Sequence, residues 1–226
     1  YFGAAGPTET PWRPPSSQAA RKPRGSVPKN GGIRGGSCLV RSMPKALMII
    51  AEGFEEIEAV TPIDLLRRAG IEVTSASTES TLQITGGRGI VLTADQMLAE
   101  CMPQIFDMLV IPGGPGVDAL RIRPEILEWV RVFHRTGKAL AAICAAPLLL
   151  LDAGVLEHHT VTSFPGNAER ELLEKAISYS VDRIHVDGNL ITARGAGVSE
   201  EFSLALIEFL KGREAAEQIR QRIVAR

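Results

Sequence analysis

Cys144 lies where the sequence pattern changes from a strand to a helix. Residues 141–147 read AAICAAP, so small residues flank the thiol, and Pro147 suits the first turn of a helix. A tight turn from strand to helix needs small neighbours and presents its side chain at the top of a sheet, as in the nucleophile elbow of hydrolases. The N-terminus of a helix also lowers the pKa of a nearby thiol. We predict a reactive cysteine; the alternative is a buried structural one.

A glycine-rich segment follows another apolar run. Residues 108–111 are apolar, and residues 112–116 read PGGPG. Glycines allow backbone N–H groups to approach a ligand, and such groups stabilise a developing oxyanion. Gly113 and Gly114 are therefore candidates for an oxyanion site, provided that they share a crevice with Cys144. The alternative is an ordinary tight turn.

Four glutamates, Glu52, Glu55, Glu56 and Glu58, crowd the start of an expected helix. Acidic residues are favoured in a first helical turn, where they are commonly solvated. Glu58 differs because its register places it toward the carboxyl edge of the sheet. We predict that Glu58 exchanges a proton with the thiol or with a substrate oxygen.

The histidines and the glycine-containing segment at residues 194–197 do not form a recognisable metal-binding or nucleotide-binding motif. His158 and His159 lack the spacing of a metal site, His134 ends a surface helix, and His185 falls in an expected strand. Residues 194–197 (RGAG) lack the third glycine of a dinucleotide fingerprint and give at most an anion-friendly turn. We predict no metal and no cofactor.

The surrounding pattern supplies the elements that must position these residues. Short apolar runs suited to buried strands alternate with amphipathic runs suited to helices, beginning with a strand at residues 45–51 and a helix at 55–68. Further strands are expected at residues 71–77, 82–85, 89–93, 108–111, 138–143, 181–185 and 190–193, and further helices at 124–134, 145–153, 198–210 and 214–224. This alternation predicts an α/β fold with a mostly parallel sheet covered by helices on both faces. Ligands then bind beyond the carboxyl ends of the strands, which selects the loops after Ala51, Ile111 and Ile143.

The charge of the chain divides near Met43. Residues 1–42 carry seven basic residues and one acidic residue, whereas residues 43–226 carry 18 basic and 25 acidic residues. The first segment is rich in proline and glycine and poor in branched apolar residues, so we expect a disordered basic leader. We expect this leader to be translated sequence upstream of the true start of the protein. The alternatives are an organelle-targeting segment and a basic tail with a weak electrostatic role. Residues 43–226 form the expected functional domain.

Composition also limits the partners of the chain. Its formal net charge of -1 gives no reason to expect nucleic acid, and no apolar run approaches the roughly 18 residues of a membrane span. Three cysteines, Cys38, Cys101 and Cys144, are too few for a disulfide framework and suggest a reducing compartment. We therefore expect a cytoplasmic protein.

Four segments together resemble the ThiJ/PfpI superfamily, in particular its parkinsonism-associated deglycase branch with the YajL-like subgroup. They are residues 51–60 (AEGFEEIEAV), 110–114 (VIPGG), 141–147 (AAICAAP) and 194–197 (RGAG). The resemblance covers about residues 43–224. It implies a flavodoxin-like sandwich, related to the class I glutamine amidotransferases, and commonly a homodimer.

The resemblance also implies roles for individual residues. Cys144 would be the oxidation-prone nucleophile and Glu58 the protonated carboxyl that hydrogen-bonds its sulfur. The backbone N–H groups of Gly114 and Ala145 would face the substrate oxygen. Arg68 and Arg88 match arginines near the site.

Two departures from the superfamily pattern indicate which branch the chain resembles. Many members of this branch place a histidine where this chain has Phe164, and the YajL-like subgroup shares its absence. Ala145 stands where the protease branch has a histidine, so a Cys–His peptidase is not expected.

The implied activity is a cofactor-independent glyoxalase or deglycase. Its substrates would be methylglyoxal, glyoxal and their early adducts on proteins or nucleotides. The alternative is a redox-sensing chaperone in which oxidation of Cys144 regulates the binding of clients.

Overall fold

The computed structural model describes residues 43–225 of the 226-residue chain. The expectations for the basic leader, Cys38 included, lie outside the described residues. No helix in the described part is long and apolar enough to cross a membrane.

Seven strands form the central sheet, in the order β10-β11-β7-β6-β1-β2-β5. Neighbouring strands are parallel, except that β10 runs antiparallel to β11. The strands of this sheet are β1 (Lys45–Ile50), β2 (Glu72–Ser77), β5 (Gln96–Met97), β6 (Met108–Ile111), β7 (Ala139–Ile143), β10 (Ile184–Asp187) and β11 (Leu190–Ala193). The prediction of a mostly parallel sheet is confirmed.

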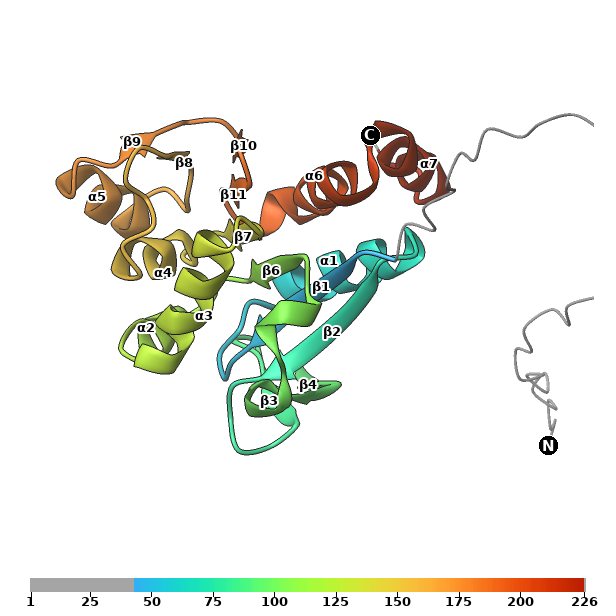
Figure 1. The fold of residues 1–226 in the computed structure, drawn as a ribbon, viewed down its shortest axis with the longest axis horizontal. Helices are drawn as coiled ribbons and strands as arrows, with labels where there is room; N and C mark the ends of the chain where they lie inside the picture. The colour runs from blue at the N-terminus through green and yellow to red at the C-terminus, as the bar shows by residue number, and fades with distance from the viewer. Residues whose placement is uncertain (1–42, 226) are drawn as a thin grey trace, which may run out of the picture. The chain divides into compact units, whose positions relative to one another are not determined.

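Helices cover both faces of this sheet (Figure 1). In β1, Leu47 and Ile49 point into one hydrophobic core, whereas Ala46, Met48 and Ile50 point into the other. The first core includes residues of α2 (Val117–Arg121), α3 (Pro124–Arg135), α4 (Pro147–Asp152) and α5 (Asn167–Glu174). The second includes residues of α1 (Glu56–Arg68), α6 (Ser199–Lys211) and α7 (Arg213–Arg222). Burial on both faces explains why the central strands are apolar without alternation.

Small elements lie at the margins of the sheet. The expected hairpin is confirmed as β3 (Gln83–Thr85) paired with β4 (Val91–Thr93). The elements that the sequence pattern did not predict are β5, α2, α5 and the pair β8 (Thr160–Val161) and β9 (Ser178–Tyr179). Short 3-10 turns occur at η1 (Leu98–Glu100), η2 (Pro103–Ile105) and η3 (Ala196–Val198). The missed elements have two to eight residues, too few for a periodic pattern to emerge from the sequence.

The sheet order brings the three selected loops together. Because β1, β6 and β7 are adjacent and parallel, the loops after Ile50, Ile111 and Ile143 leave the sheet at the same edge. The helix expected from residue 145 begins at Pro147, so residues 144–146 form the turn itself.

Candidate active site

Cys144 occupies a strained turn at the end of β7. Its φ angle is 65°, in the left-handed region that residues other than glycine rarely adopt. Two hydrogen bonds of Cys144 join this turn to neighbouring segments: its N–H donates to the Ala193 carbonyl at 2.9 Å, and its carbonyl accepts from the Phe164 N–H at 2.8 Å. A single residue in this conformation costs about 1–3 kcal/mol, and such residues cluster at functional sites. The thiol is half-buried and reduced.

Glu58 comes from the first turn of α1 and is fully buried. Its Oε2 accepts a hydrogen bond of 2.8 Å from the Gly113 N–H. Its Oε1 is buried without a hydrogen bond of standard geometry to the described residues, and the carboxyl lies near Cys144 and Ala196. The Glu58 carboxyl and the Cys144 thiol are close enough to shift each other's pKa. The structure thus brings the two predicted catalytic side chains together.

Burial raises the pKa of Glu58 to about 7. The hydrogen bond from the Gly113 N–H lowers this pKa, but its effect is smaller than that of burial. Glu55 adds to the rise, because its side chain caps α1 by accepting from the Glu58 N–H at 2.7 Å and places a second negative charge nearby. The sequence pattern did not indicate this role for Glu55, because glutamate is not among the residues preferred at a helix N-cap.

The prediction of a lowered thiol pKa is wrong for this arrangement. Burial and the negative charge of Glu58 raise the pKa of Cys144 to about 12, although the N–H groups of Ala145 and Gly114 oppose the rise. The helix that follows has only six residues, and a carboxylate lies beside the sulfur. Because the two groups lie in contact, they titrate as a pair, and above about pH 7 Glu58 and Cys144 hold one proton between them. A thiolate beside a protonated Glu58 is one of the two arrangements of that proton.

The glycine-rich loop after β6 fits against both catalytic candidates. A Cβ on Gly113 would lie 2.7 Å from the Cys144 Cβ and 2.7 Å from Glu58 Oε2, so no side chain fits there. Gly114 has a φ angle of 107°, and a Cβ there would lie 2.5 Å from the Gly53 carbonyl oxygen. These contacts require glycine and aim the N–H groups of Gly113 and Gly114 into the site.

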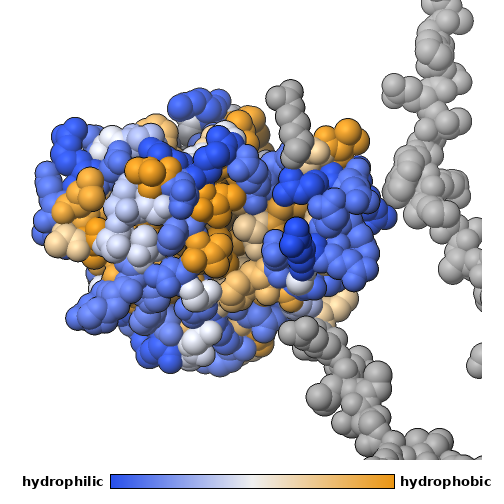
Figure 2. Space-filling model, turned by 90° about the horizontal axis from the view of Figure 1, so that it is seen from above, coloured by the Kyte–Doolittle hydropathy of each residue, from blue (hydrophilic) through white to orange (hydrophobic). Residues whose placement is uncertain are grey.

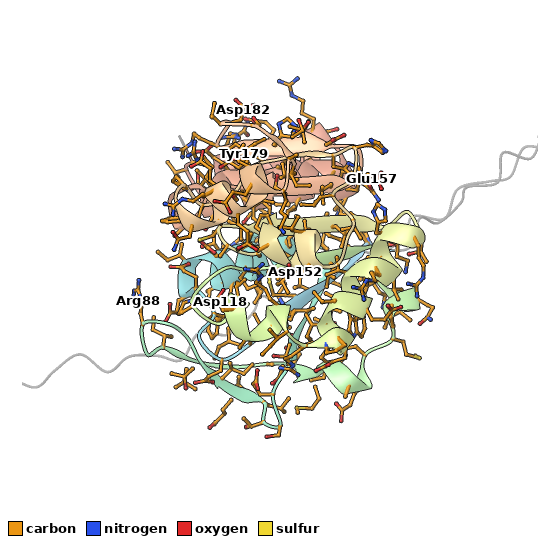
Figure 3. All side chains as sticks on the ribbon, turned by 90° about the vertical axis from the view of Figure 1, so that its left-hand side faces the viewer. Arg88, Asp118, Asp152, Glu157, Tyr179 and Asp182 are labelled. Atoms are coloured by element: carbon orange, nitrogen blue, oxygen red, sulfur yellow. The ribbon has the colours of Figure 1, made fainter. Side chains whose placement is uncertain are left out.

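Arg88 lies on the β3–β4 hairpin at the rim of the site. Its backbone N–H donates a hydrogen bond to Glu56 Oε1 at 2.6 Å. The N–H of the preceding residue, Gly87, donates to the Phe54 carbonyl. Figure 3 shows the Arg88 side chain projecting outward from the hairpin. The backbone of residue 88 is thus fixed to the loop that forms the site, while its guanidinium group is exposed.

Arg68 is not brought to the site within this chain. It is the last residue of α1, ten positions after Glu58, and so lies about 15 Å farther along the helix. Its guanidinium pairs with Asp64 at 2.7 Å on the exposed surface. Although Arg68 matches an arginine that lies near the site in the superfamily, it does not contact Cys144 or Glu58 within this chain.

Residues 194–197 join the site by their backbone. A Cβ on Gly195 would lie 3.8 Å from Glu58 Oε1 and 3.3 Å from the Phe164 ring, and the Ala196 N–H helps to lower the pKa of Glu58. The sequence pattern indicated an anion-friendly turn here, but it did not indicate that Glu58 would be the anion.

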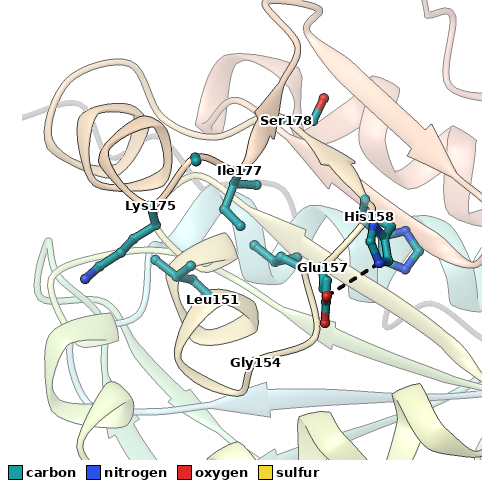
Figure 4. Close-up of a pocket in the computed structure, with 10 residues that line it drawn as sticks. Leu151, Gly154, Glu157, His158, Lys175, Ile177 and Ser178 are labelled. Carbon is teal, nitrogen blue, oxygen red and sulfur yellow. Dashed lines mark ion pairs between the residues drawn. The ribbon is translucent and has the colours of Figure 1, made fainter.

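A cavity of about 520 Å³ lies elsewhere, between α4, α5 and the β8–β9 pair (Figure 4). Its lining includes Leu151, Glu157, His158, Lys175 and Ile177, and neither Cys144 nor Glu58 contributes to it. Within residues 43–225, no cluster of histidine, cysteine and acidic side chains has the arrangement of a metal site.

The comparison with known families agrees with this geometry. The profile of the DJ-1/PfpI family matches residues 44–209. The chain belongs to the DJ-1/PfpI family. One relative is the Parkinson disease protein 7 homolog of Danio rerio, which is 36% identical over 182 residues, covering 80% of this chain and 96% of the relative.

Two further members of the DJ-1/PfpI family bear on function. The glutathione-independent glyoxalase DJR-1.2 of Caenorhabditis elegans is 30% identical over 173 residues, covering 76% of this chain and 91% of that protein. The solved structure of oxidized Toxoplasma gondii DJ-1 superposes with a TM-score of 0.75 at 32% identity, covering 80% of this chain and 98% of that one. The flavodoxin-like fold implied by the resemblance is that of this family.

Proposed function

We propose that this protein is a cysteine-dependent, cofactor-independent glyoxalase and deglycase. The observation that carries the proposal is the buried Glu58 carboxyl, held by the Gly113 N–H beside the strained turn of Cys144, with the N–H groups of Gly114 and Ala145 near the sulfur. A strained turn that presents the thiol, a carboxyl with a pKa near 7 and backbone donors are the parts that addition to a carbonyl requires. The similarity to a protein named as a glutathione-independent glyoxalase supports the same activity.

In the first step, the Glu58 carboxylate takes the proton from the Cys144 thiol, and the sulfur adds to the aldehyde carbon of methylglyoxal. The C–S bond forms as the carbonyl π bond breaks, and the electron pair moves to the oxygen. The N–H groups of Gly114 and Ala145 stabilise this oxyanion, and Glu58 donates the proton that completes a hemithioacetal.

Glu58 then serves as a base. It removes the proton from the former aldehyde carbon, the C–H electron pair forms an enediol double bond between the two carbons, and the ketone oxygen takes up a proton. The proton returns to the neighbouring carbon as the hydroxyl on the first carbon loses its own, so the first carbon is oxidised to a thioester while the ketone is reduced to an alcohol. Water hydrolyses the thioester and releases lactate and the free thiol. The sum is one methylglyoxal and one water to lactic acid, and glyoxal gives glycolate in the same way. No external oxidant or cofactor takes part.

The same chemistry extends to the early adducts of these aldehydes. A hemithioacetal or aminocarbinol on a protein or nucleotide carries the same two-carbon unit, which Cys144 would attack to free the amine or thiol. The proposed role is defence against reactive carbonyls and oxidative stress.

Replacing Cys144 with serine tests the proposal. We expect Cys144→Ser to abolish the loss of methylglyoxal and the formation of lactate, whereas Cys101→Ser, the matched control at the other described cysteine, should retain both. Full activity of Cys144→Ser would disprove the proposal.

A second function rests on the same thiol. Cys144 is half-exposed, and the N–H donors that suit an oxyanion also suit the oxygens of a sulfenic or sulfinic acid. Under this redox-sensing alternative, oxidation of Cys144 would control binding of misfolded clients. Intact-mass analysis during a peroxide titration, run beside the aldehyde assay, separates the two: oxidation at low peroxide without aldehyde turnover favours the sensor.

We further propose that the protein forms a homodimer. Apolar side chains are exposed on α1, at Ile57 and Val60, and on the β3–β4 hairpin, at Ile90 and Val91. The Glu56–Arg88 hydrogen bond joins these two elements. Figure 2 shows that hydrophobic residues interrupt the charged surface on the face it displays. Light scattering of the wild type and of Val60→Lys with Val91→Lys tests this: a dimer that dissociates on substitution supports the proposed face, and a wild-type monomer rejects the dimer.

The domain limits and the compartment are also proposals. We propose that residues 43–226 are the functional unit and that the protein works in the reducing cytoplasm. Within the family, we propose that the chain is of the YajL-like type. The match of the family profile from residue 44 supports the domain limits, and the free thiols of Cys101 and Cys144 support the compartment. Mass spectrometry of the N-terminus of the protein isolated from cells, together with fractionation, tests the domain limits and the compartment.

A further inference from the structure

Phe164 follows β8 in a segment that is anchored on three sides. The Thr162 N–H donates to Thr192 Oγ1 at 2.9 Å, and the Tyr179 hydroxyl donates to the Ser163 carbonyl at 3.2 Å. The Phe164 N–H itself donates to the Cys144 carbonyl at 2.8 Å. The backbone that carries the ring is therefore fixed directly to the turn that presents the thiol.

The ring of Phe164 remains 50% exposed although its backbone is fixed. Large apolar side chains are normally buried, because exposed apolar surface costs free energy in water. The preceding residues Thr162 and Ser163 are fully buried, so the exposed part of this segment begins at Phe164.

Distances from Gly195 locate the Phe164 ring relative to the Glu58 carboxyl. A Cβ on Gly195 would lie 3.3 Å from Cδ2 of Phe164, 3.8 Å from its Cε2 and 3.8 Å from Glu58 Oε1. The edge of the ring and the free oxygen of the catalytic carboxyl therefore border the same point. A substrate carbon bound to Cys144 and within reach of Glu58 would carry its substituent close to this ring.

We propose that the Phe164 ring is a specificity-determining residue that contacts the substituent of a 2-oxoaldehyde bound at Cys144. The ring has no polar atom, so it favours methyl and phenyl substituents over the hydrogen of glyoxal. This inference rests on the proposed function, since it names the substrate class of the same site. Hydrophobic contact selects phenylglyoxal and methylglyoxal over glyoxal.

The first test compares selectivity rather than total activity. We would measure kcat/KM for glyoxal, methylglyoxal and phenylglyoxal with the wild type, Phe164→Leu and Phe164→Ala. We expect Phe164→Ala to lower the ratio of phenylglyoxal to glyoxal by about tenfold. Phe164→Leu should lower that ratio but keep most of the preference for methylglyoxal. All variants retain the backbone N–H that supports the Cys144 turn.

Phe209→Ala is the matched control. Phe209 is also partly exposed, at 42%, but it lies on α6 beside Pro44, at the amino end of β1 and so at the edge of the sheet opposite the site. Its substitution should leave the ratio unchanged. If Phe164→Ala changes the ratio by less than twofold, including by a uniform loss on all three aldehydes, the proposal is overturned.

A second measurement does not depend on turnover. The rates at which N-phenylmaleimide and N-methylmaleimide modify Cys144 would be followed by peptide mass mapping, which separates Cys144 from Cys38 and Cys101. We expect the phenyl-to-methyl rate ratio to fall several-fold in Phe164→Ala and to stay constant in Phe209→Ala. If the wild type consumes no aldehyde but this ratio falls, the proposed function fails while the contact role of Phe164 stands. An unchanged ratio overturns the contact role.

Discussion

The backbone N–H of Gly113 donates a 2.8 Å hydrogen bond to the carboxylate of Glu58. This bond joins the loop after β6 to the first turn of α1, two segments that are 55 residues apart in the chain. It holds the buried carboxyl near Cys144, and Oε1 keeps no hydrogen-bond partner among the described residues, as the proposed proton exchange requires. The site depends on a backbone donor as much as on its two reactive side chains.

The pH dependence of turnover should report the proton shared by Glu58 and Cys144. Below about pH 7 both groups are protonated, and above it the pair holds a single proton, which is the state that supplies a nucleophile. We expect kcat/KM for methylglyoxal to rise through about pH 7 and then level off to pH 9. Glu58→Gln should lower the rate and remove the inflection; an inflection that persists in this variant would assign it to another group.

Glu58 should also make the folded state less stable as the pH rises. Its pKa is raised from 4.5 to about 7 by folding, so its favourable contribution is complete below pH 4.5 and is lost as the pH rises through about 7. The corresponding loss is about 3 kcal/mol. Glutamine cannot ionise, so urea unfolding at pH 4.5 and pH 8 should show Glu58→Gln gaining stability relative to the wild type at the higher pH. A constant difference at the two pH values would mean that Glu58 titrates normally.

Gly113 should tolerate no side chain. A methyl group would meet the Cys144 Cβ and Glu58 Oε2 at 2.7 Å, so Gly113→Ala must displace one of the reacting groups. We expect a loss of about 100-fold in kcat, because small misplacements of catalytic groups have effects of that size. Gly197→Ala is the control, since a Cβ there meets nothing within 4 Å. Equal effects of the two substitutions would contradict the prediction.

Arg121 should stabilise the helical layer that carries α5. Its guanidinium, 19% exposed, pairs with Asp152 on α4 at 2.5 Å and with Glu171 on α5. Removing it leaves two partly buried carboxylates without their cation, so Arg121→Met should lower the free energy of unfolding by about 3 kcal/mol. Arg135→Met breaks a pair with Glu128 that is more than half exposed on the arginine side and should change stability by less than about 1 kcal/mol. Urea denaturation of both variants makes the comparison, and similar losses would rule out a special role for Arg121.

Much of the fold was predictable because its signals are local. The apolar run that became β7, the small residues around Cys144 and the glycines after β6 each reflect a steric requirement visible within a few residues. The elements that were missed, such as α5 and the β8–β9 pair, are short and are held by distant partners such as Arg121 and Tyr179. Their stability comes from packing that no local window contains.

The sequence by itself determined an α/β domain and the three loops beyond the carboxyl ends of its strands, since strands that alternate with helices form a mostly parallel sheet. The strand order that makes β1, β6 and β7 neighbours was decided by the tertiary structure. The sequence also singled out Cys144 and Glu58. Only the tertiary structure decided their chemistry, because a pKa depends on burial and on charges brought together from separate segments. Glu58 beside the sulfur raises the thiol pKa that a helix start alone would lower, Arg68 lies far along α1, and Phe164 is fixed against the active-site turn.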